Sequence, residues 1–242
     1  YALNEVERYL HFSSFSFDAS IAQLFLPLRR GKPIYLFEPG LGCFWEFTQE
    51  HSIDAAHVTP SYFSQQIGLL QSPLSRPLKW LNLGGEAFDT RLLQASIEKQ
   101  VAEIIVNSYG PTECVVSSHG YVCDLSHPYP GQYQPIGKPM GGRSNYVLDN
   151  RQKLAPLGAV GELYIGGDNI ASGYLNRPEL NQQRFVNHPV KTGQKLYATG
   201  DLVRWLSDGN LEFIRRKDSQ VKLRGYRVEL GEIAVSYTHL TL

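Results

Sequence analysis

Residues 107–113 (Asn-Ser-Tyr-Gly-Pro-Thr-Glu) have the clearest chemical potential in the chain, and they follow the apolar run 104–106. The apolar run predicts a buried strand, and the Gly-Pro pair predicts a turn after it. Reactive side chains would then lie at a strand's carboxyl end, where open α/β sheets bind ligands. A tyrosine ring can stack on a base, a hydroxyl can contact phosphate or metal, and a carboxylate can hold Mg²⁺. These residues suit a nucleotide, and a tight turn with an incidental tyrosine explains them equally well.

Two further carboxylates lie where a ligand would explain them. Asp18 precedes a helical apolar pattern that runs to Leu28, so its simplest role is that of an N-cap. Beside a pocket it could instead pair with the ammonium group of a ligand. Asp201 follows Gly200 inside an expected strand, although Asp is depleted in strands and Gly weakens them. Either a β-bulge or a ligand that needs the carboxylate accounts for this pair.

The elements that would position these residues alternate between strand and helix in the first part of the chain. Strands are expected at 9–16, 32–37, 53–58, 78–83 and 104–106, and helices at 18–28, 44–51, 59–70 and 90–100. Thr59 and Asp89 are expected to cap the last two helices. Gly-Gly-Glu-Ala at 84–87 would let the backbone approach a ligand closely. This alternation predicts a largely parallel sheet covered on both faces.

The pattern changes after Ser117 to short strands between glycine turns. Strands are expected at 145–149, 161–167, 197–205 and 211–214, after a linker at 127–134. The basic stretch 215–227 contains Asp218 as its only acid and alternates with apolar residues, which favours exposed strands. This part of the chain therefore predicts an antiparallel sheet or barrel.

Composition excludes several classes of function. The 242 residues carry 23 Lys and Arg and 23 Asp and Glu, and a net charge of zero gives no electrostatic argument for a nucleic-acid or membrane partner. No apolar run approaches the roughly 20 residues needed to cross a bilayer. Cys43, Cys114 and Cys123 lack a CxxC spacing, so they indicate free thiols in a reducing compartment. We therefore expect a cytoplasmic protein that binds neither nucleic acid nor membranes.

The order of the motifs resembles that of one enzyme family. The motifs are Phe-Asp-Ala-Ser at 17–20, Gly-Gly-Glu-Ala at 84–87, Asn-Ser-Tyr-Gly-Pro-Thr-Glu at 107–113, Gly-Glu-Leu-Tyr-Ile-Gly-Gly at 161–167, Ala-Ser-Gly-Tyr-Leu at 171–175, Tyr-Ala-Thr-Gly-Asp at 197–201, Arg-Lys-Asp-Ser-Gln-Val-Lys-Leu-Arg-Gly at 216–225 and Val-Glu-Leu-Gly-Glu-Ile at 228–233. Together they resemble the adenylation domains of nonribosomal peptide synthetases, within the adenylate-forming superfamily that also includes acyl-CoA synthetases and luciferases.

The resemblance implies the α/β fold of adenylate-forming enzymes. Residues 1–125 would form a doubly covered, mostly parallel sheet that carries the substrate and adenine pocket. Residues 126–217 would form a small β-barrel-like subdomain of the same large domain. Residues 218–233 would form the hinge, at Asp218, and the first strands of the small C-terminal domain.

The resemblance also implies a two-step reaction. The carboxylate of an amino acid attacks the α-phosphate of Mg·ATP to give an aminoacyl adenylate. The acyl group then passes to the phosphopantetheine thiol of a peptidyl carrier protein domain, and a condensation domain is a further expected partner. The implied catalytic residues are Thr112 and Glu113, the second also as the Mg²⁺ ligand. The implied nucleotide-binding residues are Gly85, Glu86, Ala87, Asn107, Tyr109, Asp201 and Arg216, with Tyr109 stacked on adenine and Asp201 on the ribose.

Asp18 carries the prediction of the substrate class. By matched position it pairs with the α-ammonium group of an amino acid. This favours amino-acid activation over the alternatives of an acyl-CoA or aryl-acid ligase and of a non-catalytic nucleotide-binding module. The implied side-chain pocket is formed by Asp18 with Ala19, Ala22, His57, Asn82, Gly84, Ser108, Val116 and Ser117. Its small walls and polar tips favour a polar side chain over a bulky aliphatic one.

The chain departs from the family pattern in four places. The phosphate-binding loop that the family carries before Phe17 and the catalytic lysine of the small domain have no counterpart among the 242 residues. We therefore expect a piece of an enzyme that is inactive alone. Arg215 stands where the family usually has Gly, and residues 234–242 do not match the family and are expected to be foreign.

Overall fold

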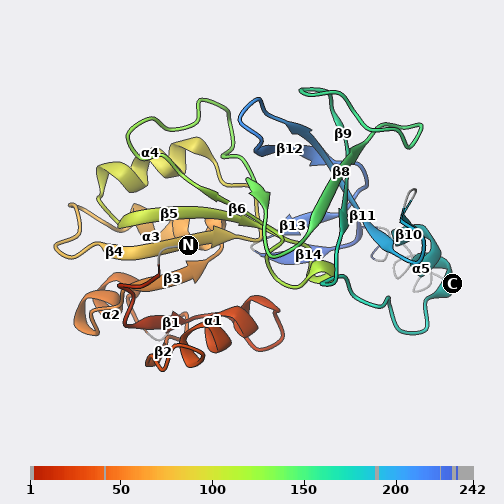
Figure 1. Cartoon of the computed structure of the whole chain (residues 1–242). Coiled ribbons are helices and arrows are strands. Elements are labelled where there is room, and N and C mark those ends of the chain that lie inside the picture. The colour runs from red at the N-terminus through yellow and green to blue at the C-terminus, as the bar shows by residue number, and fades with distance from the viewer. Residues whose placement is uncertain (1–2, 41, 189–190, 224, 231–232, 234–242) are drawn as a thin grey trace, which may run out of the picture. The chain divides into compact units, whose positions relative to one another are not determined.

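The computed structural model describes residues 3–40, 42–188, 191–223, 225–230 and 233 (Figure 1). The segment 234–242, which we expect to be foreign, lies outside these described residues. The chain divides into two compact units, Tyr1–Gly141 and Gly142–Leu242. Each unit is described by itself, and the domain limits expected from the sequence stay a prediction.

The first unit is built on a seven-stranded sheet with the strand order β2-β1-β3-β4-β5-β6-β7. Its strands are β1 (Tyr9–His11), β2 (Ile34–Leu36), β3 (Ala55–Val58), β4 (Leu78–Gly84), β5 (Ala102–Tyr109), β6 (His119–Val122) and β7 (Lys138–Pro139). The pairs among β1 to β5 are parallel, and β6 and β7 add antiparallel strands at one edge. This confirms the predicted, largely parallel sheet.

Helices cover both faces of this sheet. They are α1 (Ala19–Leu28), α2 (Phe44–Glu50), α3 (Pro60–Gly68) and α4 (Thr90–Glu98). On one face Leu81 packs in a core with Phe63 of α3 and Leu93 of α4. On the other face Trp80 packs in a separate core with Leu26 of α1. Neighbouring residues of β4 point to opposite faces, so α1 and α4 lie on opposite sides of the sheet (Figure 1).

Two of the three predicted helix caps are confirmed. Thr59 accepts a hydrogen bond from the backbone N of Tyr62 (3.4 Å), and Asp89 accepts one from the backbone N of Arg91 (2.7 Å). Asp18 immediately precedes α1, but its side chain makes no capping hydrogen bond. Its backbone is already helical (φ −62°, ψ −28°), whereas a capping residue usually is extended. The interpretation of the Asp18 carboxylate as an N-cap is therefore wrong.

Other predicted elements differ from the structure at the edges of the sheet. The strand expected at 9–16 ends at His11. The strand expected to be buried at 32–37 is the edge strand β2, in which Leu36 is 72% exposed. Apolar composition alone does not distinguish an edge strand from a central one.

The second unit is an antiparallel sheet of five strands. It contains β8 (Ser144–Leu148), β9 (Gly161–Gly166), β10 (Phe185–Asn187), β11 (Lys195–Trp205) and β12 (Leu211–Arg216), in the order β10-β11-β9-β8 with β12 also paired to β11. Among the described residues the pairing does not close into a barrel. Helix α5 (Pro178–Arg184) and β10 are elements that the sequence pattern did not predict.

A separate hairpin follows the second sheet. It is formed by β13 (Val221–Leu223) and β14 (Tyr226–Val228), and β13 is exposed along its length. This confirms the exposed strands predicted for the basic stretch. No helix in the described parts of the chain has the length and apolar character that a membrane span requires.

A buried carboxylate joins the start of the chain to the first sheet. The side chain of Asp54 is 2% exposed, accepts hydrogen bonds from the backbone N of Glu7 (2.9 Å) and Arg8 (3.0 Å), and pairs with Arg76. Burial alone would raise the pKa of Asp54, but these hydrogen bonds outweigh burial and lower it.

We expect Asp54→Ala to lower the free energy of unfolding by about 2 to 3 kcal/mol at pH 7. The loss stays below that of a fully buried pair because the Arg76 side chain is 36% exposed. Since the folded-state pKa is lowered, the stabilisation is present above the unfolded-state pKa near 4 and is lost as the pH falls through the folded-state value. Urea unfolding measures both effects. Asp124→Ala is the control, because its side chain is 54% exposed, and equal losses in the two variants would contradict the prediction.

Candidate functional site

A cavity of about 190 Å³ opens on the α1 face of the first sheet. Its walls include Ala22 and Leu26 of α1, Ala55 of β3 and Trp80 of β4. Five of the residues predicted for the side-chain pocket line it, namely Ala22, His57, Asn82, Ser108 and Ser117. The structure therefore brings together five of the nine residues predicted for the pocket, and their role in binding a substrate stays a prediction.

Three other predicted pocket residues lie outside the cavity lining, and a fourth adjoins it. Asp18, Ala19 and Val116 are not among the lining residues. Gly84 adjoins the cavity, because a Cβ atom there would lie 2.5 Å from Ser108 Oγ and 3.2 Å from His57 Nε2. Glycine at this position therefore leaves room for the two polar side chains.

Several residues that line the cavity were not predicted from the sequence. They are Leu3, Tyr9, Leu10, Gln23, Leu26, Ala55, Ala56, Trp80 and Met140. Two of them follow from periodicity, since Trp80 shares a strand face with Asn82, and Leu26 lies one helical turn after Ala22. The others come from segments whose proximity only the folded chain reveals.

The cavity is electrically neutral at its lining. Its lining residues include no Asp, Glu, Lys or Arg. Desolvation lowers the pKa of His57 to about 4, and the nearby charge of Asp18 counteracts this only in part. His57 is therefore uncharged at pH 7. Its interaction with Asp18 also shows that the Asp18 carboxylate lies near the cavity although it does not line it.

Two polar atoms of the cavity residues lack an internal partner. Asn82 Oδ1 and the hydroxyl of Tyr9 are buried and make no hydrogen bond within the described part of the chain. A buried polar group without a partner costs free energy, so such groups are rare in folded proteins. Both residues line the cavity, so a ligand bound there would lie close to these two groups.

The loop after β5 carries the predicted Thr112 and Glu113 and is strained. Val115 and Val116 have φ values of 59° and 56°, in the left-handed region that β-branched residues avoid. A Cβ atom at Gly110 would lie 2.2 Å from the carbonyl oxygen of Val116, so glycine allows the loop to fold back on itself. The loop includes a short 3₁₀ turn, η1 (Thr112–Cys114), in which Thr112 is exposed and Glu113 is buried.

Tyr109 lies at the end of β5, directly before this loop. Its ring packs edge-on against His119 at 5.3 Å between the ring centroids. Its carbonyl oxygen accepts hydrogen bonds from the backbone N (2.8 Å) and Oγ (3.2 Å) of Ser118, which closes the base of the loop. The position of Tyr109 is thus determined by both its ring and its backbone.

The other residues predicted to bind the nucleotide in this unit have structural contacts. The Glu86 carboxylate accepts hydrogen bonds from the backbone N (2.8 Å) and Oγ (3.0 Å) of Ser61 in α3. The Asn107 amide donates to the carbonyl oxygens of Gln134 (3.1 Å) and Pro135 (2.8 Å). Gly85 has φ +89° and is exposed, as is Ala87. Glu86 and Asn107 hold loops in place, while Gly85 and Ala87 present backbone at the surface.

In the second unit, Asp201 occupies a bulge in β11. The pairing of β11 with β9 shifts register between Ala198 and Leu202, and Gly200 has φ +74°. The bulge expected as one explanation of the Gly-Asp pair is therefore present. The Asp201 side chain is 8% exposed, so both explanations remain compatible with the structure.

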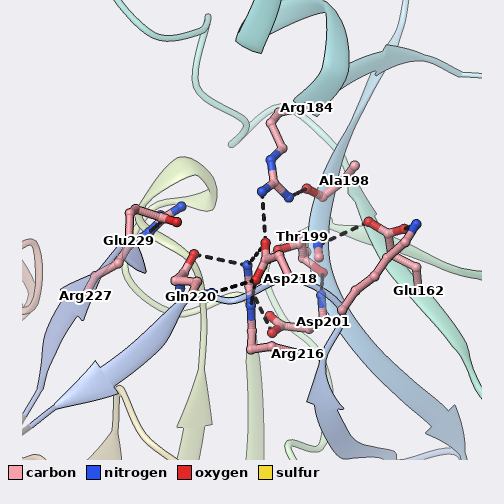
Figure 2. Close-up of polar contacts among 12 residues, drawn as sticks. Glu162, Arg184, Ala198, Thr199, Asp201, Arg216, Asp218, Gln220, Arg227 and Glu229 are labelled. Carbon is pink, nitrogen blue, oxygen red and sulfur yellow. Dashed lines mark hydrogen bonds and ion pairs between the residues drawn. The ribbon is translucent and has the colours of Figure 1, made fainter. Parts of the chain in front are cut away.

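Arg216 joins two carboxylates of this unit (Figure 2). Its Nη1 donates to Asp201 Oδ1 (2.9 Å) and to the carbonyl oxygen of Thr199 (2.8 Å). Its Nε and Nη2 donate to the two carboxylate oxygens of Asp218 (2.9 and 2.6 Å). A bidentate guanidinium–carboxylate pair is among the strongest hydrogen-bonded contacts in proteins. The structure thus brings together the three residues predicted for this region.

Other residues without a role predicted from the sequence join the cluster in Figure 2, among them Arg184, Glu162 and Gln220. Arg184, the last residue of α5, donates from Nη2 to Asp218 Oδ2 (3.0 Å). Glu162 accepts from the backbone N of Gly200 (3.2 Å) and from Lys217 Nζ (2.8 Å). Burial alone would raise the pKa of Asp218, but hydrogen bonds from Arg216 and Arg184 lower it to about 2.

The described residues provide no preformed metal cage. No group of three or more His, Cys, Asp or Glu side chains among them could hold a metal ion. Mg²⁺ in nucleotide sites usually is bound by one or two carboxylates together with phosphate oxygens and water. A single buried carboxylate, Glu113, fits that donor set when the nucleotide supplies the phosphates.

Comparison with known proteins agrees with this geometry. The model of the AMP-binding enzyme family matches residues 1–175. Bacitracin synthase 3 of Bacillus licheniformis is 40% identical over 237 residues, which cover 96% of this chain and 4% of that protein. Surfactin synthase subunit 1 of Bacillus subtilis (strain 168) is 37% identical over 227 residues, which cover 90% of this chain and 6% of that protein.

Two solved structures share the fold over nearly the whole chain. An NRPS protein containing adenylation and PCP domains, bound to a vinylsulfonamide inhibitor, matches with a TM-score of 0.85 and 29% identity over 96% of this chain and 41% of its own. The Vibrio cholerae adenylation domain AlmE, in complex with glycyl-adenosine-5'-phosphate, matches with a TM-score of 0.85 and 28% identity over 95% of this chain and 44% of its own. The chain therefore spans only a part of the relatives that it matches.

The ring of His57 provides a test of the cavity. We expect it to titrate near pH 4, well below the ordinary value of 6.5, because the surrounding protein desolvates it. Asp18→Asn should lower the midpoint further, since the Asp18 charge raises this pKa. As the folded-state pKa lies below the unfolded-state value, stability should fall as the pH drops from about 6.5 to 4. NMR of the ring signals, identified with His57→Gln, measures the midpoint, and a value near 6.5 would show that the ring is solvated.

Proposed function

The chain belongs to the family of AMP-binding enzymes, and we propose that the protein activates an α-amino acid with ATP to form an aminoacyl adenylate. The observation that carries this proposal is the neutral cavity beside Asp18, at the carboxyl ends of β3, β4 and β5. The lining includes five of the nine residues expected to surround an amino-acid side chain. The similarity to an adenylation domain solved with glycyl-adenosine-5'-phosphate supports the same assignment.

Asp18 would hold the α-ammonium group of the substrate. Its carboxylate makes no helix cap, lies near His57, and bears a charge that the cavity lining does not neutralise. An ammonium group held there would direct the substrate's side chain towards Asn82 and Ser108, within the cavity.

The loop after β5 would contact the nucleotide. Tyr109 offers a ring for stacking on adenine, and Thr112 offers an exposed hydroxyl for phosphate. Glu113 would hold Mg²⁺, which stabilises the negative charge on the phosphates when it is bound. The strained backbone at Val115 and Val116 is consistent with a loop whose geometry is determined by a ligand rather than by folding stability.

Within the second unit, Asp201 would bind the ribose hydroxyls. The carboxylate can accept hydrogen bonds from both hydroxyls, and the hydrogen bond from Arg216 fixes its orientation. Asp218 would serve as the hinge, since it lies in the short connection between β12 and the hairpin. Its pairing with Arg184 and Arg216 would hold the hinge in one conformation.

In the proposed reaction, a carboxylate oxygen of the amino acid attacks the α-phosphorus of ATP and pyrophosphate leaves. The acyl group then passes from the adenylate to the phosphopantetheine thiol of a carrier protein, with release of AMP. Similarity to an NRPS protein that contains adenylation and PCP domains supports the carrier as a partner. A condensation domain as a further partner rests on the sequence resemblance alone.

The cavity favours a neutral, hydrogen-bonding side chain in the substrate. A charged side chain would enter a lining without a countercharge, and burying an unpaired charge is costly. A purely aliphatic side chain would offer no hydrogen bond to the polar residues of the lining, Asn82, Ser108 and Ser117. A side chain with an apolar stem and a polar end satisfies both conditions.

Amino-acid-dependent ATP–pyrophosphate exchange by the full-length protein tests the proposed function. We expect exchange with amino acids such as Gln, Asn, Thr or Tyr, and at least about tenfold less with Lys, Glu, Leu or Val, because unpaired polar or charged groups are penalised. A preference for Leu or Val would overturn the assigned substrate class. Exchange only with aryl or fatty acids would favour an acyl-CoA or aryl-acid ligase, and ATP binding without any exchange would favour a nucleotide-binding module.

Two isosteric substitutions separate the amino-acid site from the nucleotide site. Asp18→Asn should raise the KM for the amino acid by about tenfold or more, because one charge-assisted hydrogen bond is lost, while the KM for ATP changes little. Asp201→Asn should instead raise the KM for ATP and change the KM for the amino acid little. Steady-state exchange kinetics measure both constants, and equal effects of each substitution on both substrates would contradict the assigned roles.

A further inference from the structure

Strands β1 and β3 pair at a single position beside the cavity. The parallel ladder between them contains the pair Tyr9↔Ala55. The next rungs, towards the carboxyl ends, would involve the backbone of Phe12, Ser13 and His57. These groups lie at the edge of the sheet where the cavity opens, and they find a different partner.

That partner is the side-chain amide of Gln23, which lies on α1 and is 6% exposed. Its Oε1 accepts hydrogen bonds from the backbone N of Phe12 (2.8 Å) and Ser13 (2.9 Å). Its Nε2 donates to Ser13 Oγ (2.9 Å) and to the carbonyl oxygen of His57 (2.9 Å). A primary amide offers two acceptor positions and two donors, so all four are used.

We propose that Gln23 is a positioning residue that holds β1 and β3 apart at their carboxyl ends and thereby shapes the wall of the substrate cavity. Its amide takes the place of a peptide group in the ladder, but it comes from a helix and occupies the space between the strands. The inference rests on the proposed function, in which this cavity receives the side chain of the amino acid.

The position of Gln23 links this contact to the cavity. Gln23 itself lines the cavity, next to Ala22 and one turn before Leu26. It holds the backbone of His57, whose ring is another part of the wall. A shift of the amide would therefore move both α1 and the His57 ring relative to a bound side chain.

A second glutamine in the same unit makes the same kind of contact away from the cavity. Gln49 of α2 donates from Nε2 to the carbonyl oxygen of Arg76 (2.9 Å) and accepts from Ser75 Oγ (2.9 Å) and the backbone N of Arg76 (3.2 Å). It is not among the cavity residues. Gln49→Leu is thus a matched control for a glutamine that only connects two segments.

Two substitutions of Gln23 separate its contacts. Gln23→Leu keeps much of the volume and removes all four hydrogen bonds. Gln23→Glu keeps acceptors for the backbone N of Phe12 and Ser13, but its ionised carboxylate cannot donate to His57 and would repel that carbonyl oxygen. If the contact to β3 shapes the cavity, Gln23→Glu should raise the KM for the amino acid although its contact to β1 is retained.

The experiment measures exchange kinetics of the full-length protein for these three variants, together with their melting temperatures. Both Gln23 variants should raise the KM for the amino acid by about tenfold and change the relative rates across an amino-acid panel, while the KM for ATP stays within about twofold. Gln49→Leu should lower the melting temperature and leave the amino-acid KM and the panel unchanged. If the Gln23 and Gln49 variants behave alike, the proposal is overturned.

Hydrogen–deuterium exchange distinguishes failure of this inference from failure of the proposed function. If the wild-type protein activates no amino acid, the proposed function fails, but the contact is still testable. Gln23→Leu should then accelerate amide exchange in 9–13 and 55–58, and Gln49→Leu should not. Unchanged exchange in both segments of Gln23→Leu would show that the amide does not hold these strands.

Discussion

The alternation of side chains along the parallel strands is the constraint on which the first unit depends. Leu81 and Leu83 point into the core beneath α3 and α4, so Trp80 and Asn82 must point to the face covered by α1. Because the strands are parallel and in register, His57 pairs with Asn82 and Gly84 pairs with Ser108. The same alternation thus fills a hydrophobic core on one face of the sheet and brings polar side chains together on the other face.

The second unit depends on a different constraint, the balance of charge around one guanidinium group. Arg216 is held between Asp201 and Asp218, and Arg184 adds a second cation to Asp218. The Asp201 side chain is only 8% exposed, so burying it without Arg216 would be unfavourable. At Asp218, the hydrogen bonds from Arg216 and Arg184 lower the pKa. Glu162 acts at the other side of the bulge, where it binds the backbone of Gly200 and the next cation, Lys217. Ion pairs and hydrogen bonds thus stabilise the bulge, while Leu196 and Ala198 of the same strand pack in an apolar core.

What the sequence predicted follows from interactions that are local along the chain. Apolar runs and capping residues such as Thr59 and Asp89 act within a few residues, so they identified the central strands and helices. Helix α5 was missed because it has no buried residue and hence no apolar period. Arg184 and Lys217 were missed as partners because their ion pairs join residues 34 and 55 positions apart. From the sequence alone Gln23 is an ordinary polar helix residue, and only the folded structure shows its contacts with two strands.

Several features that are unfavourable to stability lie at the proposed substrate cavity and the loop after β5. The neutral His57 ring is desolvated, Asn82 Oδ1 is buried without a partner among the described residues, and Val115 and Val116 are left-handed. Gln23 stands among them as a fully hydrogen-bonded group, so it is not itself a source of strain. Its role is to bridge β1 and β3 where their ladder ends and so to hold the cavity wall in place. On this view the fold gives up regular pairing at one edge of its sheet, and a single side-chain amide limits the loss while leaving room for a substrate.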